Sequence, residues 1–383
     1  MRVALLHGYS SANAGDGLLV EESVVLLREA LGSAVDVTLA ASDPSSFEHL
    51  GIDAVKSLPG LRGYDNQYVR VLRNLDNFDL VVGVGGGYLR AGYPEEAAKM
   101  SLVHGPQLLA AARTSAPTIY LPQSVGPAKA PWNRGIGRAL SQIDRFFVRD
   151  DRSLAEFGRY GATRASDLAI LASNPEVATS APERVPVVSA RPVRGKVPPL
   201  VTDLCRQIRV FDGYIQSETG GNDDRQVMNS IGARRIVPRD ELMLGGSARR
   251  VVVAVRLHAA LMALRAGHFV IHLAYERKGF GAFEDLGLSE YVHNVNMFEP
   301  ARVVQQARDL VADSAVRNRY RNQYRAAVES ARSNRENLVN EIRILANRIE
   351  KAEEPRLPGS VSQGAAHVAE SRRSFGATSR GRK

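Results

Sequence analysis

The chain contains the stretch Val251-Val252-Val253-Ala254-Val255-Arg256-Leu257-His258-Ala259-Ala260-Leu261. Its β-branched apolar run predicts a buried strand over Val251–Val255, and the apolar spacing that follows predicts a helix over Leu257–Ala266. Arg256 and His258 therefore lie where a strand passes into a helix, where free backbone N–H groups and the helix dipole favour an anion. An arginine there can bind a phosphate or carboxylate through two hydrogen bonds, and a histidine can transfer a proton near neutral pH. An Arg-x-His pair also serves as packing or capping residues, but its position at the carboxyl end of a strand favours function.

The same alternation of strand-length apolar runs and amphipathic helices extends over most of the chain, which predicts an α/β protein with parallel sheets. The expected strands of the first half are 2–7, 35–39, 80–84, 118–121 and 145–148, and those of the second half are 185–188, 209–211, 251–255 and 269–273. We expect loops at Gly8–Gly15 and Gly83–Tyr88, a strand end at Pro122 and an N-cap at Asp16. The carboxyl ends of such strands are where open α/β sheets bind ligands.

Five prolines between Val177 and Leu200 mark a boundary between two Rossmann-like units. We predict an N-terminal domain, a proline-rich linker with the first strand of the next domain, a C-terminal domain, C-terminal helices and a disordered basic tail, at residues 1–176, 177–199, 185–299, 300–351 and 352–383. An apolar stripe from Val316 to Ile349 predicts a helix that packs back across the domains; a coiled-coil homodimer is the alternative.

Composition excludes several classes of protein. The chain has 383 residues, of which 44% are hydrophobic and 24% charged, so it is neither disordered throughout nor fibrous. Its single cysteine, Cys205, can form no internal disulfide, and no run of about 18 apolar residues could span a bilayer. The N-terminal apolar run is too short for the core of a signal peptide, so we expect a cytoplasmic protein.

The net charge of +9 is concentrated at the C-terminus, where the residues from Pro355 onward include six basic side chains and one acidic side chain. A solvated tail explains this excess better than a nucleic-acid partner, and contact with an anionic membrane is the alternative.

Other candidates follow the remaining strands. Arg149 precedes a helix that Asp150 is expected to cap through Ser153, and Arg149 could face the same anion as Arg256. Tyr275 and Lys278 are expected in a polar loop, where Lys278 is either a second positive contact or a surface lysine. The loops at 13–17 and 83–88 match neither a dinucleotide fingerprint nor a P-loop, and no carboxylate or histidine completes a metal site with Asp150 and Asp151.

Together these motifs resemble those of the polysaccharide pyruvyl transferase family. The matching residues, in unbroken order over about 2–290, are Gly15-Asp16, Gly85-Gly86-Gly87, Leu121-Pro122-Gln123-Ser124-Val125-Gly126-Pro127, Arg149-Asp150-x-x-Ser153, Arg256-Leu257-His258-Ala259, Ala263-x-x-x-Gly267, Tyr275-x-x-Lys278 and Glu284-Asp285-Leu286-Gly287-Leu288. The resemblance implies a GT-B-like fold, with two Rossmann-like domains facing across a cleft. The chain departs from the family at Ala254, where Ser is frequent, and at His268-Phe269, which replace Val-Pro.

The resemblance also implies an activity: transfer of a pyruvyl group from phosphoenolpyruvate to a sugar of a cell-surface polysaccharide or glycolipid, which forms a ketal and releases phosphate. Carried over by position, the catalytic candidates are Arg149, Arg256 and His258, and the substrate-binding candidates are Gly15, Asp16, Gly85, Gly86, Gly87, Gln123, Ser124, Tyr275 and Lys278. No cofactor or metal is expected, because phosphoenolpyruvate is a co-substrate that cationic side chains can hold. His258 would supply the proton, and Asp16 and Asp79 are candidate bases.

The acceptor is expected to be a sugar or glycan, free or lipid-linked, reached in the cytoplasm or at the inner face of the membrane. Two other interpretations stay open. One is a nucleotide-sugar glycosyltransferase on the same two-domain fold. The other is a non-catalytic binding protein whose helix over 316–349 and basic tail are the interaction surfaces.

Overall fold

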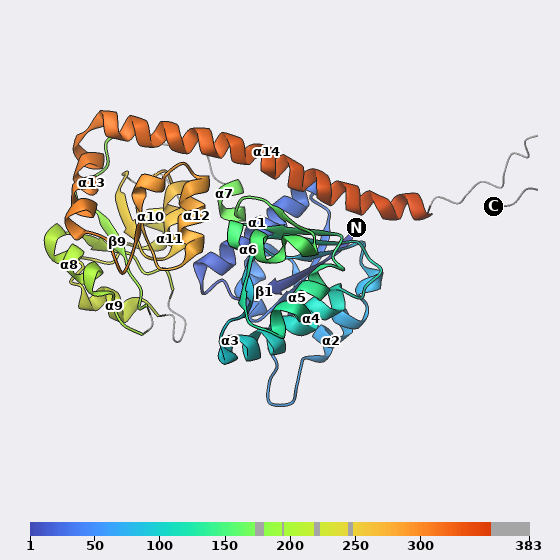
Figure 1. Cartoon of the computed structure of the whole chain (residues 1–383). Coiled ribbons are helices and arrows are strands. Elements are labelled where there is room, and N and C mark those ends of the chain that lie inside the picture. Colours follow the sequence, from blue (N-terminus) through green and yellow to red (C-terminus); the bar gives the residue numbers. More distant parts are fainter. Residues whose placement is uncertain (173–179, 194, 218–222, 244–247, 354–383) are drawn as a thin grey trace, which may run out of the picture.

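The computed structural model describes residues 1–172, 180–193, 195–217, 223–243 and 248–353. Two α/β domains, each built on a parallel sheet, lie side by side, and one long helix crosses both of them (Figure 1). The predicted tail over 352–383 falls outside the described residues from 354 onward, as do 173–179 of the predicted boundary region and 218–222 of the second domain.

The N-terminal sheet has the strand order β3-β2-β1-β4-β6-β7-β8, with β5 paired to β6. Its strands are β1 (Arg2–Gly8), β2 (Asp36–Ala41), β3 (Asp53–Lys56), β4 (Leu80–Gly83), β5 (Gly86–Ala91), β6 (Thr118–Ala128), β7 (Arg145–Val148) and β8 (Ala162–Arg164). The residues of β1 alternate between two cores, with Val3 and Leu5 on one face of the sheet and Ala4 and Leu6 on the other. Both faces are covered, which is why the central segments Val3–Leu6 of β1 and Leu80–Gly83 of β4 are apolar without alternation.

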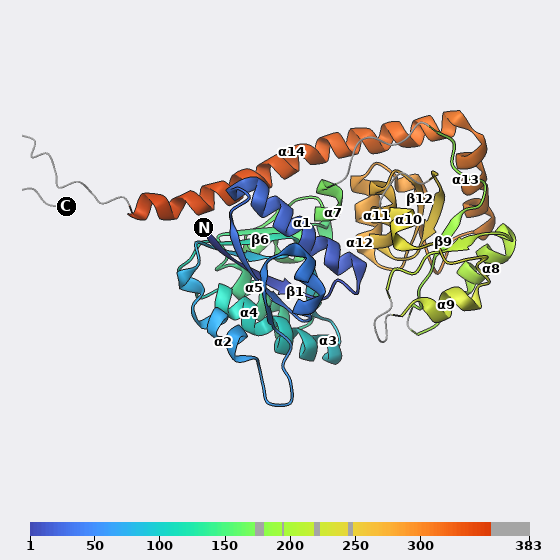
Figure 2. The same ribbon diagram turned by 180° about the vertical axis from the view of Figure 1, so that it is seen from behind.

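Helices cover the two faces of this sheet (Figure 2). They are α1 (Ala14–Leu31), α2 (Asn66–Arg73), α3 (Pro94–Lys99), α4 (Gly105–Ala111), α5 (Trp132–Leu140), α6 (Asp151–Phe157) and α7 (Leu168–Leu171), with a π-helical segment, η3 (Met100–His104), between α3 and α4. As predicted, Asp150 caps α6: its carboxylate accepts hydrogen bonds from the backbone N–H and the hydroxyl of Ser153.

The C-terminal sheet has the order β10-β9-β11-β12-β13, a doubly wound arrangement. Its elements are β9 (Val187–Ser189), α8 (Pro199–Ile208), β10 (Asp212–Gly213), α9 (Arg225–Ser230), α10 (Arg239–Met243), β11 (Val251–Ala254), α11 (Leu257–Arg265), β12 (Phe269–Ala274), α12 (Arg277–Asp285), β13 (Val292–Asn294) and α13 (Pro300–Ala312). The central strands β11 and β12 are completely buried, in agreement with the uninterrupted apolar sequence from Val251.

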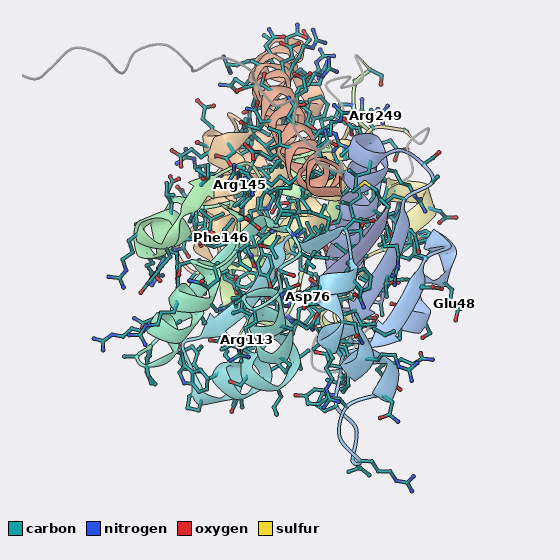
Figure 3. All side chains as sticks on the ribbon, turned by 90° about the vertical axis from the view of Figure 1, so that its right-hand side faces the viewer. Glu48, Asp76, Arg113, Arg145, Phe146 and Arg249 are labelled. Carbon is teal, nitrogen blue, oxygen red and sulfur yellow. The ribbon has the colours of Figure 1, made fainter. Side chains whose placement is uncertain are left out.

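The final helix, α14 (Ser314–Glu353), spans 40 residues and packs on both domains (Figures 1 and 2). Near its start, the Tyr320 hydroxyl exchanges hydrogen bonds with the backbone of Val270 in β12. Farther along, Arg335 binds Glu29 of α1, and Glu341 accepts a hydrogen bond from Arg145, the first residue of β7, which Figure 3 labels. The apolar stripe of the sequence therefore packs back across the domains, as predicted.

Four local expectations were wrong. The strand at Thr118 continues through Pro122 to Ala128, because Pro122 falls where the pairing with β7 shifts register and no N–H is needed. Within the expected loop Gly83–Tyr88, Gly86 begins strand β5. The strand expected at 209–211 lies at Asp212–Gly213.

The fourth error concerns helix starts. Asn13, not Asp16, is the N-cap of α1: its side chain accepts a hydrogen bond from the backbone N–H of Gly15, and Asp16 lies in the first turn. Likewise Lys278 lies in the first turn of α12 and not in a loop. In both places the helix begins earlier in the chain than the sequence predicted.

Among the helices of the described ranges, none combines the length and the apolar character that a bilayer crossing requires.

Candidate functional site

The carboxyl ends of both parallel sheets meet at the contact between the domains. Strand β11 ends at Ala254, Arg256 is the N-cap of α11, and His258 lies in the first turn of that helix. Opposite it is the first turn of α1, where a Cβ atom on Gly15 would lie only 2.5 Å from His258 Nδ1. The absence of a side chain at Gly15 is therefore what admits the imidazole ring between the domains.

The environment of His258 keeps its ring uncharged. Burial lowers the pKa of His258 to about 3; the charges of Arg149, Lys278 and Arg256 act in the same direction, and only Asp167 opposes them. Its Nε2 atom is buried and has no hydrogen-bond partner among the residues that the structure describes. A buried polar atom without a partner is costly and requires an explanation, which a bound ligand would supply.

Arg149 lies in the same cluster but is already paired. It follows β7, its Nε donates to Ser124 Oγ at 3.0 Å, and its Nη1 makes a buried ion pair with Asp167, the N-cap of α7. Burial raises the pKa of Asp167, but the charge of Arg149 and the hydrogen bonds from Arg149 and the Ala169 N–H outweigh this effect, so the pKa is lowered and the carboxylate stays ionised. The other terminal nitrogen, Nη2, lies 3.7 Å from where a Cβ of Gly87 would be, on the ligand side of the sheet.

Arg256 is likewise engaged within the protein. Its Nε and Nη2 donate to the two carboxylate oxygens of Asp224 at 2.6 and 2.7 Å, in a buried bidentate pair. This edge of the guanidinium, which the sequence assigned to an anionic ligand, therefore holds a carboxylate of the protein. Burial raises the pKa of Asp224 even though Arg256 lowers it.

A pocket of about 690 Å³ opens between the domains beside this cluster. Of the predicted site residues, Gly87, Ser124, Tyr275 and Lys278 line it. Lys278 pairs with Glu276 at 3.0 Å and also lies close enough to influence the pKa of both His258 and Asp16. It thus connects the pocket with the buried cluster.

The other predicted residues lie behind the pocket wall. Gly85 packs against the backbone of Pro122, where a Cβ would come within 2.8 Å of the carbonyl oxygen, and Gly86 packs against Tyr88. Gln123 is fully buried within β6. Of the three consecutive glycines, Gly87 alone faces the pocket, so we assign Gly85 and Gly86 to close packing of the strands.

The two candidate bases lie far apart in the fold. Asp16 is in the first turn of α1, accepts a hydrogen bond from Asn13 Nδ2 at 2.8 Å, and has a pKa that burial raises while Lys278 lowers it. Asp79 lies at the amino end of β4, where it accepts a hydrogen bond from the backbone N–H of Arg2. That is the edge of the sheet opposite the ligand side, so Asp79 is wrong as a candidate base.

Several residues of the site were not found from sequence. Arg191 follows β9, donates to the Tyr275 hydroxyl at 2.9 Å and lines the pocket together with Arg90 and Arg152. The carboxyl-end rule that selected Arg149 and Arg256 would also have selected Arg191. No sequence signal marks Asp167 or Asp224, because their roles depend on ion pairs formed over 18 and 32 residues.

Within the described ranges, no group of three or more histidine, cysteine or acidic side chains has a metal-binding arrangement.

The architecture defines the class of protein. The structure resembles that of S. aureus MnaA with UDP, with 13% identity, a TM-score of 0.54 and coverage of 94% of this chain and 100% of that one. It also resembles a mutant O-GlcNAc transferase of Thermobaculum terrenum (13% identity, TM-score 0.51, 91% and 69% of the two chains) and the glycotransferase of kitacinnamycin (12%, 0.51, 91% and 98%). At such identities the likeness shows the fold alone, which is GT-B.

Within that fold, the sequence gives a closer assignment. The family model of polysaccharide pyruvyl transferase matches residues 13–277, and the chain belongs to this family. Among curated proteins, none matches the chain significantly.

Proposed function

We propose that this transferase moves a pyruvyl group from phosphoenolpyruvate to two hydroxyl groups of a sugar in a cell-surface polysaccharide or glycolipid, in the cytoplasm or at the inner membrane face. The observation that carries the proposal is the unpartnered Nε2 of His258, surrounded by Arg149, Arg256 and Lys278 where the domains meet. The family match supports the pyruvyl transfer.

The cationic side chains of the site would have different roles in this reaction. Lys278 and Arg191 line the pocket and would bind the carboxylate and phosphate of the donor, together with the Nη2 group of Arg149 near Gly87. Arg256, held by Asp224, would contribute through its charge rather than through the edge that Asp224 occupies. These groups stabilise the phosphate as it leaves.

The reaction balances with one acid and one base. His258 gives a proton to C3 of the donor, so that C2 becomes electrophilic, and a sugar hydroxyl oxygen bonds to C2 as Asp16 accepts its proton. The C2–O bond to phosphate then breaks, and a second hydroxyl oxygen bonds to C2 to close the ketal. Its proton leaves with phosphate, and the proton on Asp16 restores His258 through solvent.

An imidazole with a pKa of about 3 carries no proton that it could donate at neutral pH, so the proposal requires the bound donor to raise this pKa. The donor carries negative charges that offset Arg149, Arg256 and Lys278, the groups that lower this pKa besides burial. Binding of phosphoenolpyruvate should therefore be coupled to uptake of a proton by His258.

Two measurements test the proposal. Titration calorimetry at pH 6.5 in buffers of different ionisation enthalpy should show proton uptake when phosphoenolpyruvate binds, and His258→Gln should abolish it. With a sugar acceptor, the same variant should release phosphate at least about 100-fold more slowly. The control His49→Gln, whose exposed side chain contacts Glu21 of α1, should not change the rate. Equal turnover in His258→Gln and the wild type would refute the acid role.

A nucleotide-sugar glycosyltransferase is the competing function on this fold. In thermal-shift titrations, phosphoenolpyruvate should stabilise the protein and UDP-sugars should not. Stabilisation by a UDP-sugar alone would replace the proposed donor.

A further inference from the structure

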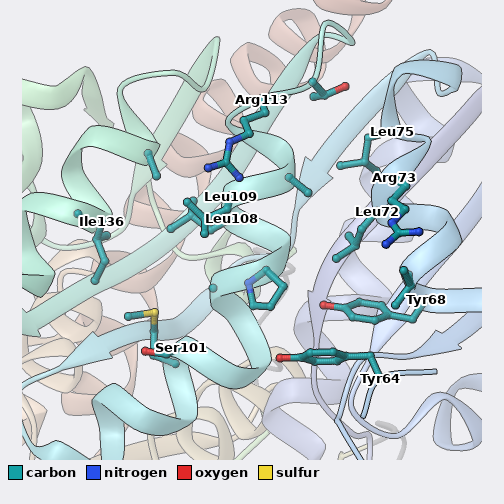
Figure 4. Close-up of a pocket in the computed structure, with 18 of the residues that line it drawn as sticks. Tyr64, Tyr68, Leu72, Arg73, Leu75, Ser101, Leu108, Leu109, Arg113 and Ile136 are labelled. Atoms are coloured by element: carbon teal, nitrogen blue, oxygen red, sulfur yellow. The ribbon is translucent and has the colours of Figure 1, made fainter. Parts of the chain in front are cut away.

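A second pocket, of about 750 Å³, lies in the N-terminal domain between α2, α4 and α5. Its lining includes Tyr68, Leu72, Leu108 and Ile136, whose side chains Figure 4 shows around the opening. A pocket of this size and apolar character is large enough for a hydrocarbon chain or a drug-sized ligand. None of the groups of the candidate functional site lines it.

Exposed apolar side chains surround this pocket. Leu109 and Trp132 belong to its lining and are 47% and 40% exposed. Leu61 is fully exposed in the loop that projects from this side of the domain, seen at the bottom of Figure 1, and Leu102 is also exposed. The Tyr64 hydroxyl, itself at the pocket, donates to the Leu102 carbonyl at 2.6 Å and so fixes the loop beside it. We call these four side chains and the pocket the apolar face.

Two arginines, Arg73 and Arg113, line the same pocket (Figure 4). Both are exposed, and within the part of the chain that the structure describes neither guanidinium has an ion-pair partner. The nearby carboxylate, Asp76, instead accepts hydrogen bonds from Thr114 and Ser115 at 2.6 to 2.9 Å. The apolar face thus combines exposed leucines and a tryptophan with unpaired positive charge.

We propose that the apolar face docks the enzyme on a membrane leaflet that contains anionic lipids. Leucine and tryptophan side chains at a surface enter the boundary between headgroups and acyl chains, and nearby arginines bind lipid phosphates. A second copy of this chain fits less well, because a twofold interface through this face would bring Arg73 and Arg113 of one copy against those of the other. The proposal stands apart from the proposed reaction.

The apolar face lies near the pocket between the domains. A polar pocket of about 620 Å³ includes Asn133, the neighbour of Trp132 in α5, and shares Tyr93, Pro127 and Arg152 with the pocket between the domains. A lipid-linked ligand in the docked leaflet could therefore reach the pocket between the domains along α5.

The chain offers its own probe, because Trp132 is its single tryptophan. The full-length protein is mixed with vesicles of phosphatidylcholine containing 30% phosphatidylglycerol, with pure phosphatidylcholine vesicles, and with inorganic phosphate alone. We expect co-sedimentation with the anionic vesicles, a blue shift of Trp132 emission, and quenching of Trp132 by brominated acyl chains. Pure phosphatidylcholine should bind at least tenfold more weakly, and phosphate alone should leave the emission unchanged.

Two variants and two matched controls locate the contact. Leu61→Asp, and Arg73→Gln with Arg113→Gln, should each weaken vesicle binding about tenfold or more. Met297→Asp, which changes an exposed side chain of the other domain, and Arg319→Gln with Arg325→Gln, on α14, should have no such effect.

Three outcomes would overturn the proposal. Vesicle binding without quenching of Trp132 would assign the contact to another segment, such as the basic C-terminal residues. Equal binding to neutral and anionic vesicles would remove the role of the arginines. A lipid-free dimer that Leu61→Asp dissociates would show that the apolar face is covered by a second copy.

Discussion

The arginines of the site carry charges that the protein balances before any ligand arrives. Arg149 and Arg256 each pair with a buried aspartate, Asp167 and Asp224. A buried charge without a partner would be strongly destabilising, so these carboxylates allow the guanidinium groups to remain ionised in the interior. The cationic groups that remain available to a ligand are those that line the pocket. Within the buried pairs, Arg149 and Arg256 lower the pKa of His258, whereas Asp167 raises it.

Substitution of Gly15 should displace the imidazole ring of His258 directly, because the two residues are in close contact. In Gly15→Ala the new Cβ would overlap the His258 ring at 2.5 Å, so the ring or the whole of α1 must move. We expect a loss of transfer activity of about 100-fold, comparable to removal of the acid, with the fold retained in circular dichroism.

The matched control for this substitution is Gly281→Ala in α12, where an added Cβ meets no atom within 4 Å. It should keep full activity and gain slightly in stability, because alanine favours a helix more than glycine does. Gly15→Ala with the activity of the control would contradict the close contact between the domains.

Among the elements, α14 depends on the alternation of buried and exposed side chains along its length. Ile342 is completely buried against the N-terminal domain, whereas Ile344, two residues on, is 51% exposed. Ile342→Ala should lower the free energy of unfolding by about 2 to 5 kcal/mol, and Ile344→Ala should change it by about 0.5 kcal/mol or less. Urea denaturation of both variants checks this; a loss for Ile342→Ala as small as that for Ile344→Ala would show that α14 is detached in solution.

The strands and helices that sequence predicted well are those with long apolar runs. Arg145–Val148 has the predicted bounds, and the strands at Val251 and Phe269 differ by one residue at an end. The short edge strands β3, β8 and β13 were missed, because three or four residues that are half-exposed carry little periodic signal. The glycines around Gly86 led to the wrong prediction of a loop, because their small size allows close packing of strands there.

For the site, sequence could predict which residues follow the strands but not which of them face the ligand. Gly87, Ser124, Tyr275 and Lys278 line the pocket, whereas Gln123 and two of the glycines do not. The local backbone conformation decides whether a residue at the end of a strand faces the pocket or the interior. Ion pairs that form across the fold, such as Arg256 with Asp224, decide which side chains are already engaged.

The protein as a whole buries histidines in their neutral form, which makes its stability depend on pH. Burial lowers the pKa of His268 to about 4; its Nε2–H donates to the Leu242 carbonyl, and its Nδ1 accepts from the N–H of Arg250. Protonation of Nδ1 must break the hydrogen bond that it accepts from the Arg250 N–H. Between about pH 4 and the unfolded pKa of 6.5 the unfolded chain binds more protons, so stability rises with pH in this window and levels off above it.

Comparison of the wild type with His268→Gln isolates this contribution, since Asp16 and Asp224 keep their raised pKa values, which act in the opposite direction, in both proteins. Urea denaturation at pH 4.5, 5.5 and 6.5 should give a slope steeper in the wild type by about 1 kcal/mol per pH unit. Parallel slopes would mean that His268 already carries a proton in the folded protein.

The long helix across both domains limits how the molecule can move. Because α14 is anchored to β12 through Tyr320 and to α1 through Arg335, the two domains are joined along one side by a continuous hydrogen-bonded rod that bends more easily than it stretches. The domains cannot drift apart there. The pocket between the domains can therefore widen only by a pivoting of one domain on the other about an axis near this rod, and it opens most on the side remote from the rod.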